Sequence, residues 1–314
     1  MIVTIDDDFD LDAIADSGQC FRWERVGAGA YRVLHGARCL RIRALARNAF
    51  ELDCGAAEYG AVWRDYFDLD EDYRRIRMRI DPAVDPFLFA AAEQQKGIRI
   101  LRQDPWEALV CFLISQNKNI PAIRRSVALL AETCGMRLED RSGAAYYAFP
   151  GPAEVAAMDA EALRRCGLGY RCAYVHAAAV AVLAGKIDLE RLKNADEETT
   201  VAALTGLYGV GAKVAGCVSL FGLHHTDAFP RDVWIRRVLA QEYPEGYPFD
   251  RYTPYNGVCQ QYMFAYSRAQ ATKAPQRRDP RRKPHAAAPS DETVPGGARV
   301  PAIRSESILS KPQV

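Results

Sequence analysis

Short runs of alternating apolar and polar residues occupy much of the first 55 or so positions. Each run is about six residues long, and its period of two is typical of a β-strand with one buried face. Gly-Ala pairs lie between successive runs, where the chain must turn. The runs are Phe21–Val26, Ala30–His35 and Arg38–Arg43, and together they predict an antiparallel sheet with one covered face.

Beyond about residue 59 the apolar residues recur with the spacing of helices. Asp104 and Pro105 indicate a helix start, because Asp caps the first turn and Pro has no N–H that needs a partner there. Helical patterns cover residues 59–95, 105–114, 121–133, 153–165, 170–184, 197–204, 232–241 and 254–271. We therefore expect an α+β fold, with an antiparallel sheet domain and flanking helices over residues 1–95 and a helical domain over residues 96–271.

The composition changes near residue 271, where Pro, Arg, Ala and Ser become dominant. Residues 268–314 contain ten Lys and Arg against four Asp and Glu, a charge of +6, which leaves −5 for residues 1–267. A segment of this kind buries too little apolar surface to fold by itself. Residues 272–314 are therefore predicted to form a disordered basic tail.

Composition also indicates in which cellular compartment the protein acts and whether it needs a metal or a cofactor. No run of about 18 apolar residues is present, and the acidic start of the chain lacks the features of a signal peptide. Nine cysteines without paired spacing indicate reduced thiols, so we expect a cytoplasmic protein, associated with the nucleoid if it is bacterial. His224 and His225 are adjacent and point apart, no phosphate-binding Gly-rich loop occurs, and we expect neither a metal nor a cofactor.

Residues 204–220 contain two apolar helical segments separated by three glycines, Gly206, Gly209 and Gly211. Gly adopts positive φ at little cost, so these glycines permit a sharp reversal of the chain. A new helix begins at Gly211, and its unpaired N–H groups form a site for an anion such as a DNA phosphate. An ordinary helix C-cap followed by a surface lysine is the simpler interpretation, and the glycines alone do not decide between the two.

Lys213 lies just inside the new helix, and Asp232 follows 19 positions later, after a Phe-Pro-Arg turn. A neutral lysine amine can attack the C1′ atom of a deoxyribose and form a Schiff base. A nearby carboxylate can stabilise the positive charge that develops on the sugar. The other interpretation is a solvated lysine and a helix N-cap, because the residues after Asp232 have a helical pattern.

A helix-hairpin-helix, a lysine and an aspartate after a Pro turn resemble the signature of the HhH-GPD DNA glycosylases. Residues 17–266 resemble the 8-oxoguanine DNA glycosylase branch of this superfamily, in five separate segments. The first segment, Gly18–Trp23, is similar to that family's Gly-Gln-x-Phe-Arg-Trp strand. The resemblance implies that the Gly18 carbonyl accepts the N7–H of the oxidised base, which guanine lacks. Otherwise Gly18 simply starts a strand.

Two further segments resemble the parts of that family that enter the duplex. Ser115–Ile120 is similar to the family's Ser-x-Asn-x-Asn-Ile turn, and the resemblance assigns Asn117 to the gap left by the flipped nucleotide. In Leu168–Arg171 it assigns Tyr170 to stacking at the lesion and Arg171 to the edge of the opposite cytosine. The alternatives are a helix C-cap at Asn117 and an ordinary loop at residues 168–171.

The last two segments supply a base pocket by the same resemblance. Cys217, one helical turn after Lys213, covers one face of the flipped base. Gln260 pairs with the Watson–Crick edge, and Phe264 stacks on the other face, since both side chains lie on one side of a helix. The alternative for Phe264 is packing in the hydrophobic core.

The resemblance implies a monomeric, bifunctional DNA glycosylase and AP lyase that excises 8-oxoguanine opposite cytosine from double-stranded DNA. The four-cysteine iron–sulfur loop of some relatives is absent after Cys217. Two other functions remain open: an alkylated-base glycosylase, which generally uses water and needs no Lys213, and a non-catalytic damage-sensing protein. The opposite base also remains open, because three positions depart from the best-known eukaryotic members: Lys118, Pro121 and Ala122.

Overall fold

The computed structural model describes residues 1–273, and residues Met1–Ala274 form one compact unit. The predicted tail lies outside the described residues from position 274 onward. Two hydrophobic cores are present, one between the N-terminal sheet and its helices and one within the helical region. In residues 1–273, no helix combines the length and the apolar character that a membrane span requires.

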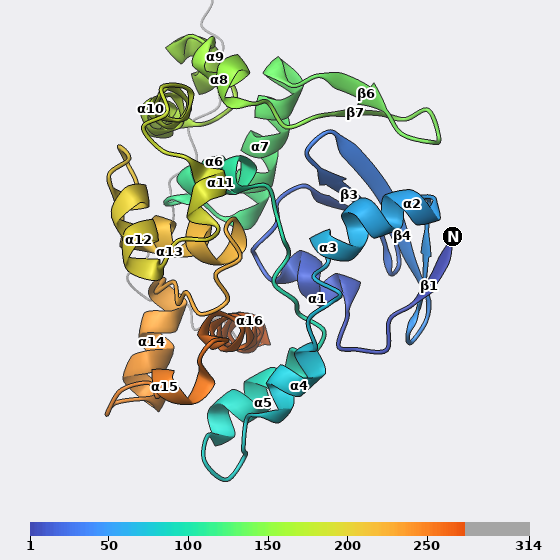
Figure 1. The fold of residues 1–314 in the computed structure, drawn as a ribbon, viewed down its shortest axis with the longest axis vertical. Coiled ribbons are helices and arrows are strands. Elements are labelled where there is room, and N and C mark those ends of the chain that lie inside the picture. The colour runs from blue at the N-terminus through green and yellow to red at the C-terminus, as the bar shows by residue number, and fades with distance from the viewer. Residues whose placement is uncertain (274–314) are drawn as a thin grey trace, which may run out of the picture. The chain divides into compact units, whose positions relative to one another are not determined.

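The N-terminal sheet is antiparallel and five-stranded, in the order β1-β5-β4-β3-β2 (Figure 1). Tyr31 and Val33 on β3 pair with Ile42 and Leu40 on β4, and all four side chains are buried on the covered face. The predicted antiparallel sheet is thus confirmed, with two additional strands at one side. The strands are β1 (Ile2–Thr4), β2 (Trp23–Gly27), β3 (Ala30–His35), β4 (Arg38–Ala46) and β5 (Ala49–Leu52).

A short helix, α1 (Leu11–Asp16), interrupts the region that the alternation pattern assigns to strands. Asp10 caps it by accepting a hydrogen bond from the Ala13 N–H at 2.9 Å. Leu11 and Ile14 are buried in the core of the sheet. The helix is too short to show a helical period in the sequence, and it matters because its C-terminal end leads directly to Gly18.

The region predicted as helical over residues 59–95 consists of several short helices. The chain bends at Asp68, which has a positive φ of 52° and accepts a hydrogen bond from Tyr73. Trp63 and Phe67 pack against the sheet core before that bend. The elements are α2 (Ala56–Glu58), the π-helical η1 (Tyr59–Trp63), α3 (Arg64–Tyr66), α4 (Tyr73–Met78) and α5 (Pro86–Gln94).

The helical region starts at Asp104, which caps α6 as predicted by accepting from the Glu107 N–H. The helix predicted over residues 153–165 is divided into two helices, because Asp159 caps a new helix in its middle. The hairpin of β6 (Arg137–Glu139) and β7 (Ala145–Tyr147) was not predicted, because each strand has three residues. The helices are α6 (Pro105–Ser115), α7 (Ile120–Cys134), α8 (Pro152–Ala156), α9 (Ala160–Arg165), the 3₁₀-helical η2 (Gly169–Arg171), α10 (Cys172–Leu183), α11 (Leu189–Leu192), α12 (Glu197–Thr205), α13 (Ala212–Phe221), α14 (Val233–Glu242), α15 (Phe249–Tyr252) and α16 (Asn256–Lys273).

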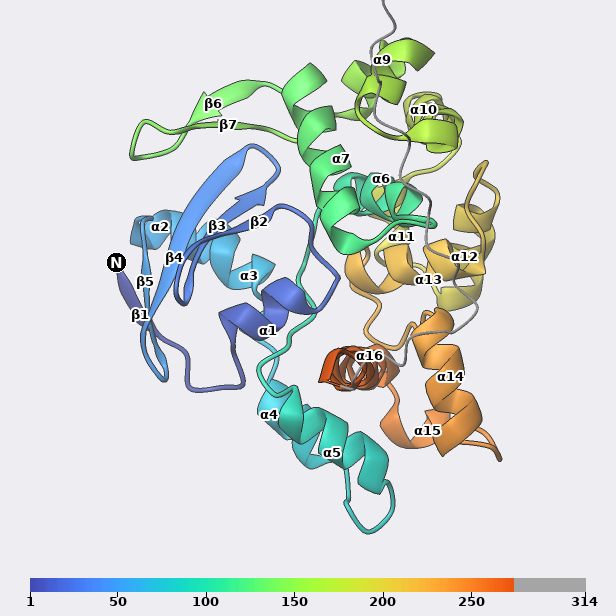
Figure 2. The ribbon, with the colours of Figure 1, turned by 180° about the vertical axis from the view of Figure 1, so that it is seen from behind.

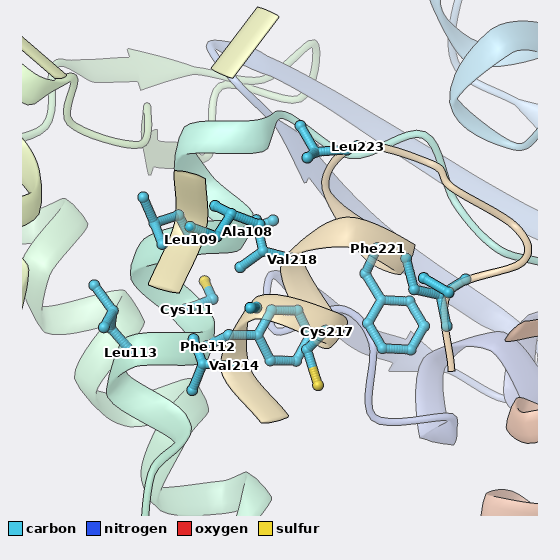
Figure 3. Packing of buried hydrophobic residues seen from close by; sticks show 14 of the residues in the cluster. Ala108, Leu109, Cys111, Phe112, Leu113, Val214, Cys217, Val218, Phe221 and Leu223 are labelled. Carbon is cyan, nitrogen blue, oxygen red and sulfur yellow. The ribbon is translucent and has the colours of Figure 1, made fainter. Parts of the chain in front are cut away.

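The packing of α6 against α13 forms the centre of the helical core (Figure 3). Phe112 of α6 and Phe221 of α13 stack with their ring centroids 5.5 Å apart. On the other side, α16 lies between α5 and α14 in both ribbon views (Figure 1, Figure 2). These contacts bring the start of α13, the start of α14 and the middle of α16 close to the loop after α1.

Candidate active site

The hairpin between α12 and α13 has the predicted reversal, but only one of its glycines requires a positive φ. Gly209 has a φ of +84°, and a Cβ atom there would lie 2.2 Å from Cγ of Tyr174. Gly206 and Gly211 have φ values of −67° and −97°. Gly211 is the N-cap of α13 and provides no side-chain cap, so N–H groups of the first turn remain available for an anion.

We predict that Gly209→Ala lowers the stability by about 2–5 kcal/mol, from left-handed strain and overpacking against Tyr174 together. The displaced hairpin is also expected to bind duplex DNA more weakly. Gly143→Ala is the matched control, because Gly143 has a φ of +80° with open space around its Cβ position. The control carries only the strain, about 1–2 kcal/mol. Urea melts of both variants measure the difference, and equal losses would contradict the contact with Tyr174.

A small cavity of about 60 Å³ lies where these elements meet. A volume of this size has room for a few water molecules but is smaller than a purine base. The six side chains or glycines predicted for catalysis and base binding all line it, although they come from four separate segments of the chain. The lining consists of Ser17, Gly18, Phe112, Lys213, Cys217, Phe221, Pro230, Asp232, Gln260, Gln261 and Phe264.

The two predicted catalytic residues reach the cavity from the starts of neighbouring helices. Lys213, in the first turn of α13, places its Nζ atom 5.5 Å from the centroid of the Phe112 ring. Asp232 is the N-cap of α14, and its Oδ1 accepts a hydrogen bond from the Ile235 N–H at 2.8 Å. The second carboxylate oxygen, Oδ2, takes no part in this cap. The cap therefore fixes the carboxylate and leaves one oxygen available in the cavity.

Cys217 forms one wall of the cavity, one turn after Lys213. Burial raises the pKa of its thiol, and the nearby Lys213 cation opposes only part of this increase. The sulfur therefore remains a neutral thiol, which is an apolar and polarisable surface for an aromatic ring.

Gln260 and Phe264 form the opposite side of the cavity, both on α16. The Gln260 amide nitrogen donates to the Pro230 carbonyl at 3.0 Å, which requires that Oε1 points the other way. That oxygen is buried and has no hydrogen-bond partner within residues 1–273. The Phe264 ring lies against Gly18, with Cε1 3.3 Å from the position of a Gly18 Cβ atom. A planar base can enter only if this ring moves.

Gly18 lies in the loop between α1 and β2, so it does not start a strand. It has a φ of +82°, and its carbonyl accepts no hydrogen bond from residues 1–273. The next residue anchors the loop: Gln19 donates to the Arg99 carbonyl and accepts from the Leu101 N–H. Further along, a buried ion pair at 3.0 Å joins Arg22 to Glu107 on α6.

Asn117, Tyr170 and Arg171, three of the residues predicted to contact DNA, are connected by direct contacts. Asn117 has a φ of 51° and donates to the Tyr170 hydroxyl at 3.0 Å. Tyr170 is half exposed, whereas Arg171 is buried, with its guanidinium 4.3 Å from the centroid of the Tyr170 ring. Arg171 donates to the carbonyls of Gln116 and Leu168. In this structure Arg171 supports the turn beneath Tyr170 and does not point outward.

Gln116 was missed in the sequence, where it is only the variable position of the Ser-x-Asn turn. Its side-chain amide donates to the Gly209 carbonyl at 3.1 Å, and its own carbonyl accepts from Arg171. It thus joins the turn at Asn117, the η2 segment and the hairpin.

The positions that depart from the eukaryotic pattern have structural roles here. Lys118 donates to the Gly167 carbonyl and to the Ser126 hydroxyl, which ties the loop before η2 to α7. Pro121 occupies the first turn of α7, and the Ala122 N–H donates to the Asn119 cap. In residues 1–273, no group of His, Cys, Asp or Glu side chains is arranged to hold a metal ion.

This arrangement of hairpin, lysine and capping aspartate defines a base-excision DNA glycosylase fold, and residues 110–244 match the HhH-GPD superfamily of base excision DNA repair proteins. Residues 1–109 match the N-terminal domain of 8-oxoguanine DNA glycosylase. The chain belongs to the 8-oxoguanine DNA glycosylase family of that superfamily.

Individual relatives agree with this assignment. The structure of MBOgg1 in complex with a low-affinity DNA ligand shares 36% identity and a TM-score of 0.81, covering 86% of this chain and 96% of that chain. A Clostridium acetobutylicum 8-oxoguanine glycosylase/lyase, in complex with DNA containing cytosine opposite 8-oxoG, shares 30% identity and a TM-score of 0.79, covering 86% and 98%. The Arabidopsis thaliana N-glycosylase/DNA lyase OGG1 is 32% identical over an aligned region of 232 residues. This region covers 71% of this chain and 63% of that relative's length.

Proposed function

We propose that this chain is a bifunctional DNA glycosylase and AP lyase that excises 8-oxoguanine opposite cytosine from double-stranded DNA. One observation carries the proposal: Lys213 and Asp232 share a cavity with two acceptors that have no donor among residues 1–273, the Gly18 carbonyl and Gln260 Oε1. A monomer in the cytoplasm remains our expectation.

The two unpaired acceptors specify the base. The Watson–Crick edge of a guanine carries N1–H and N2–H donors, which suit Gln260 Oε1. Oxidation at C8 adds an N7–H donor, which suits the Gly18 carbonyl, whereas normal guanine has a lone pair at N7. Undamaged guanine would therefore place two acceptors against each other in a buried site, and that penalty favours the lesion.

The chemistry follows from the two helix starts. Nζ of Lys213 attacks C1′ of the flipped nucleotide, the C1′–N9 bond breaks, and the base leaves with the bonding electrons. The Asp232 carboxylate stabilises the positive charge on the sugar during this step. The attached nitrogen then loses one proton, the C1′–O4′ bond breaks as O4′ takes up a proton, and a Schiff base forms between Nζ and C1′. This Schiff base loses a C2′ proton, the C3′–O bond breaks, and the 3′ phosphate leaves. Attack by the amine distinguishes this chain from an alkylated-base glycosylase that uses water.

The test is a duplex that carries a single 8-oxoguanine opposite cytosine. The protein is expected to release the base and cut the lesion strand without added alkali. A duplex with guanine at the same position is the control and should stay intact. Base release that needs alkali for strand cleavage would show a water-based glycosylase, and binding without release would show a damage sensor.

Phe264→Ala is expected to slow excision of 8-oxoguanine by about 5- to 150-fold, because base stacking contributes roughly 1–3 kcal/mol. A pre-formed abasic site has no base to stack, so its cleavage should be unchanged. Single-turnover assays on the two substrates separate the pocket from the core interpretation. Equal losses on both substrates in folded protein would show that Phe264 acts only in packing.

A further inference from the structure

Three consecutive carbonyls at the end of α1 each accept a hydrogen bond from a side chain of the helical region. Arg124 of α7 donates to Ala15 at 2.8 Å. Arg268 and Gln261 of α16 donate to Asp16 at 3.1 Å and to Ser17 at 2.6 Å. The next carbonyl in the chain is that of Gly18, and no donor among residues 1–273 reaches it.

This pattern explains how the Gly18 oxygen obtains a fixed position. The last carbonyls of a helix have no partner within the helix, so other donors must satisfy them. Here the donors come from α16, which lines the cavity, and from α7, which follows the Asn117 turn. Side chains of other helices therefore fix the loop as far as Ser17. The positive φ of Gly18 then turns the chain.

Arg268 also contacts the opposite wall of the cavity. The centre of its guanidinium lies 5.2 Å from the centroid of the Phe264 ring, one helical turn earlier on α16. Its Nη1 atom lies 3.6 Å from the position that a Gly18 Cβ atom would occupy. One side chain thus contacts both the loop that presents the acceptor and the ring that must move to admit a base.

We propose that Arg268, assisted by Arg124, is a specificity-determining positioning residue that fixes the Gly18 carbonyl for an N7–H donor and sets the resting position of Phe264. This inference rests on the proposed function, because it concerns how the same pocket distinguishes the oxidised base from guanine.

The experiment compares Arg268→Ala, Arg124→Ala and Arg268→Lys with Arg125→Ala as the matched control. Arg125 is the exposed neighbour of Arg124 on α7 and has no partner among residues 1–273, so its removal changes only the charge near DNA. Three quantities are measured: single-turnover excision of 8-oxoguanine, cleavage of a pre-formed abasic site, and the affinity ratio between duplexes with 8-oxoguanine and with guanine.

Arg268→Ala is expected to slow excision by about tenfold and to lower the affinity ratio several-fold. The reason is that the hydrogen bond to the Asp16 carbonyl, which helps to position the Gly18 carbonyl, is lost. Cleavage of the abasic site should stay within about twofold of wild type. Arg124→Ala should act in the same direction with a smaller effect, and Arg268→Lys should recover most of the ratio because it keeps a donor for Asp16.

An unchanged affinity ratio in Arg268→Ala, or the same loss in Arg125→Ala, would overturn the proposal. A parallel loss of excision and abasic-site cleavage would also overturn it, because that result indicates a structural role alone. If Arg268→Ala does not fold, Arg124→Ala tests the proposal instead, because it removes the neighbouring hydrogen bond to the Ala15 carbonyl and should lower the affinity ratio. Failure of the proposed function is separately visible, since wild-type protein would then not excise 8-oxoguanine.

Discussion

Lys213→Gln is expected to abolish excision of 8-oxoguanine and cleavage of the DNA strand, with a loss on the order of 10³-fold or more. Glutamine has no nucleophilic amine, so no Schiff base can form. It keeps most of the side chain's length, and buried side chains such as Val214 and Val218 still pack α13 against α6 when the contact of Lys213 with the Phe112 ring is lost. The variant should therefore remain folded and bind lesion DNA.

Borohydride reduction measures this prediction directly, because it converts a Schiff base into a stable covalent complex. Wild-type protein should be trapped on 8-oxoguanine DNA and Lys213→Gln should not. Lys118→Gln is the control, since Lys118 lies near the Asn117 turn but donates to protein oxygens. It should still be trapped. Efficient trapping of Lys213→Gln would assign the attack to another amine and refute the proposed mechanism.

Asp232→Asn is expected to slow excision on the order of 10²-fold while leaving the stability nearly unchanged. The carboxylate charge that stabilises the sugar cation is lost. The helix cap survives, because the asparagine oxygen can accept from the Ile235 N–H as Asp232 does now, and Asn and Asp are equally good caps. Some borohydride trapping should remain, since the amine of Lys213 is still present.

Single-turnover rates and urea melts on the same protein check this prediction. Asp196→Asn provides the matched exchange at another cap, where Asp196 accepts from the Thr199 N–H on α12 away from the cavity. That control should leave the excision rate unaltered. A normal rate in Asp232→Asn would limit Asp232 to its capping role, and a large loss of stability would show that the two roles cannot be separated.

Residues with strong local preferences gave the reliable parts of the fold prediction. Asp104 and Asp232 were predicted as helix starts, and both accept the expected backbone hydrogen bonds. The alternating runs near Ala30–His35 predicted the sheet for a similar reason, since one face is buried. α1 and the hairpin of β6 and β7 were missed because a segment of three to six residues shows too little of either period.

Only those site residues that belong to short sequence motifs could be predicted. Lys213, Gln260 and Gly18 were located by short motifs, and the structure brings them into one cavity. The contacts that hold those motifs could not be read in advance, because Gln116 and Arg268 bind backbone carbonyls of distant segments. Every residue type has a main-chain oxygen, so the sequence does not show which residue accepts such a hydrogen bond. The inward position of Arg171 was missed for the same reason.

The hydrogen bonds of Gln116 have a consequence for how the protein searches DNA. They connect the turn beside Asn117 to residues 55 and 93 positions away, so these three segments are ordered before any duplex arrives. Little conformational entropy is then lost by the protein on docking. The cost of forming the complex falls mainly on the DNA, which must bend and release a nucleotide from the stack, and this cost is smallest where a damaged base is already weakly stacked or paired. Discrimination thus begins in the mechanics of the duplex, before any base reaches the pocket.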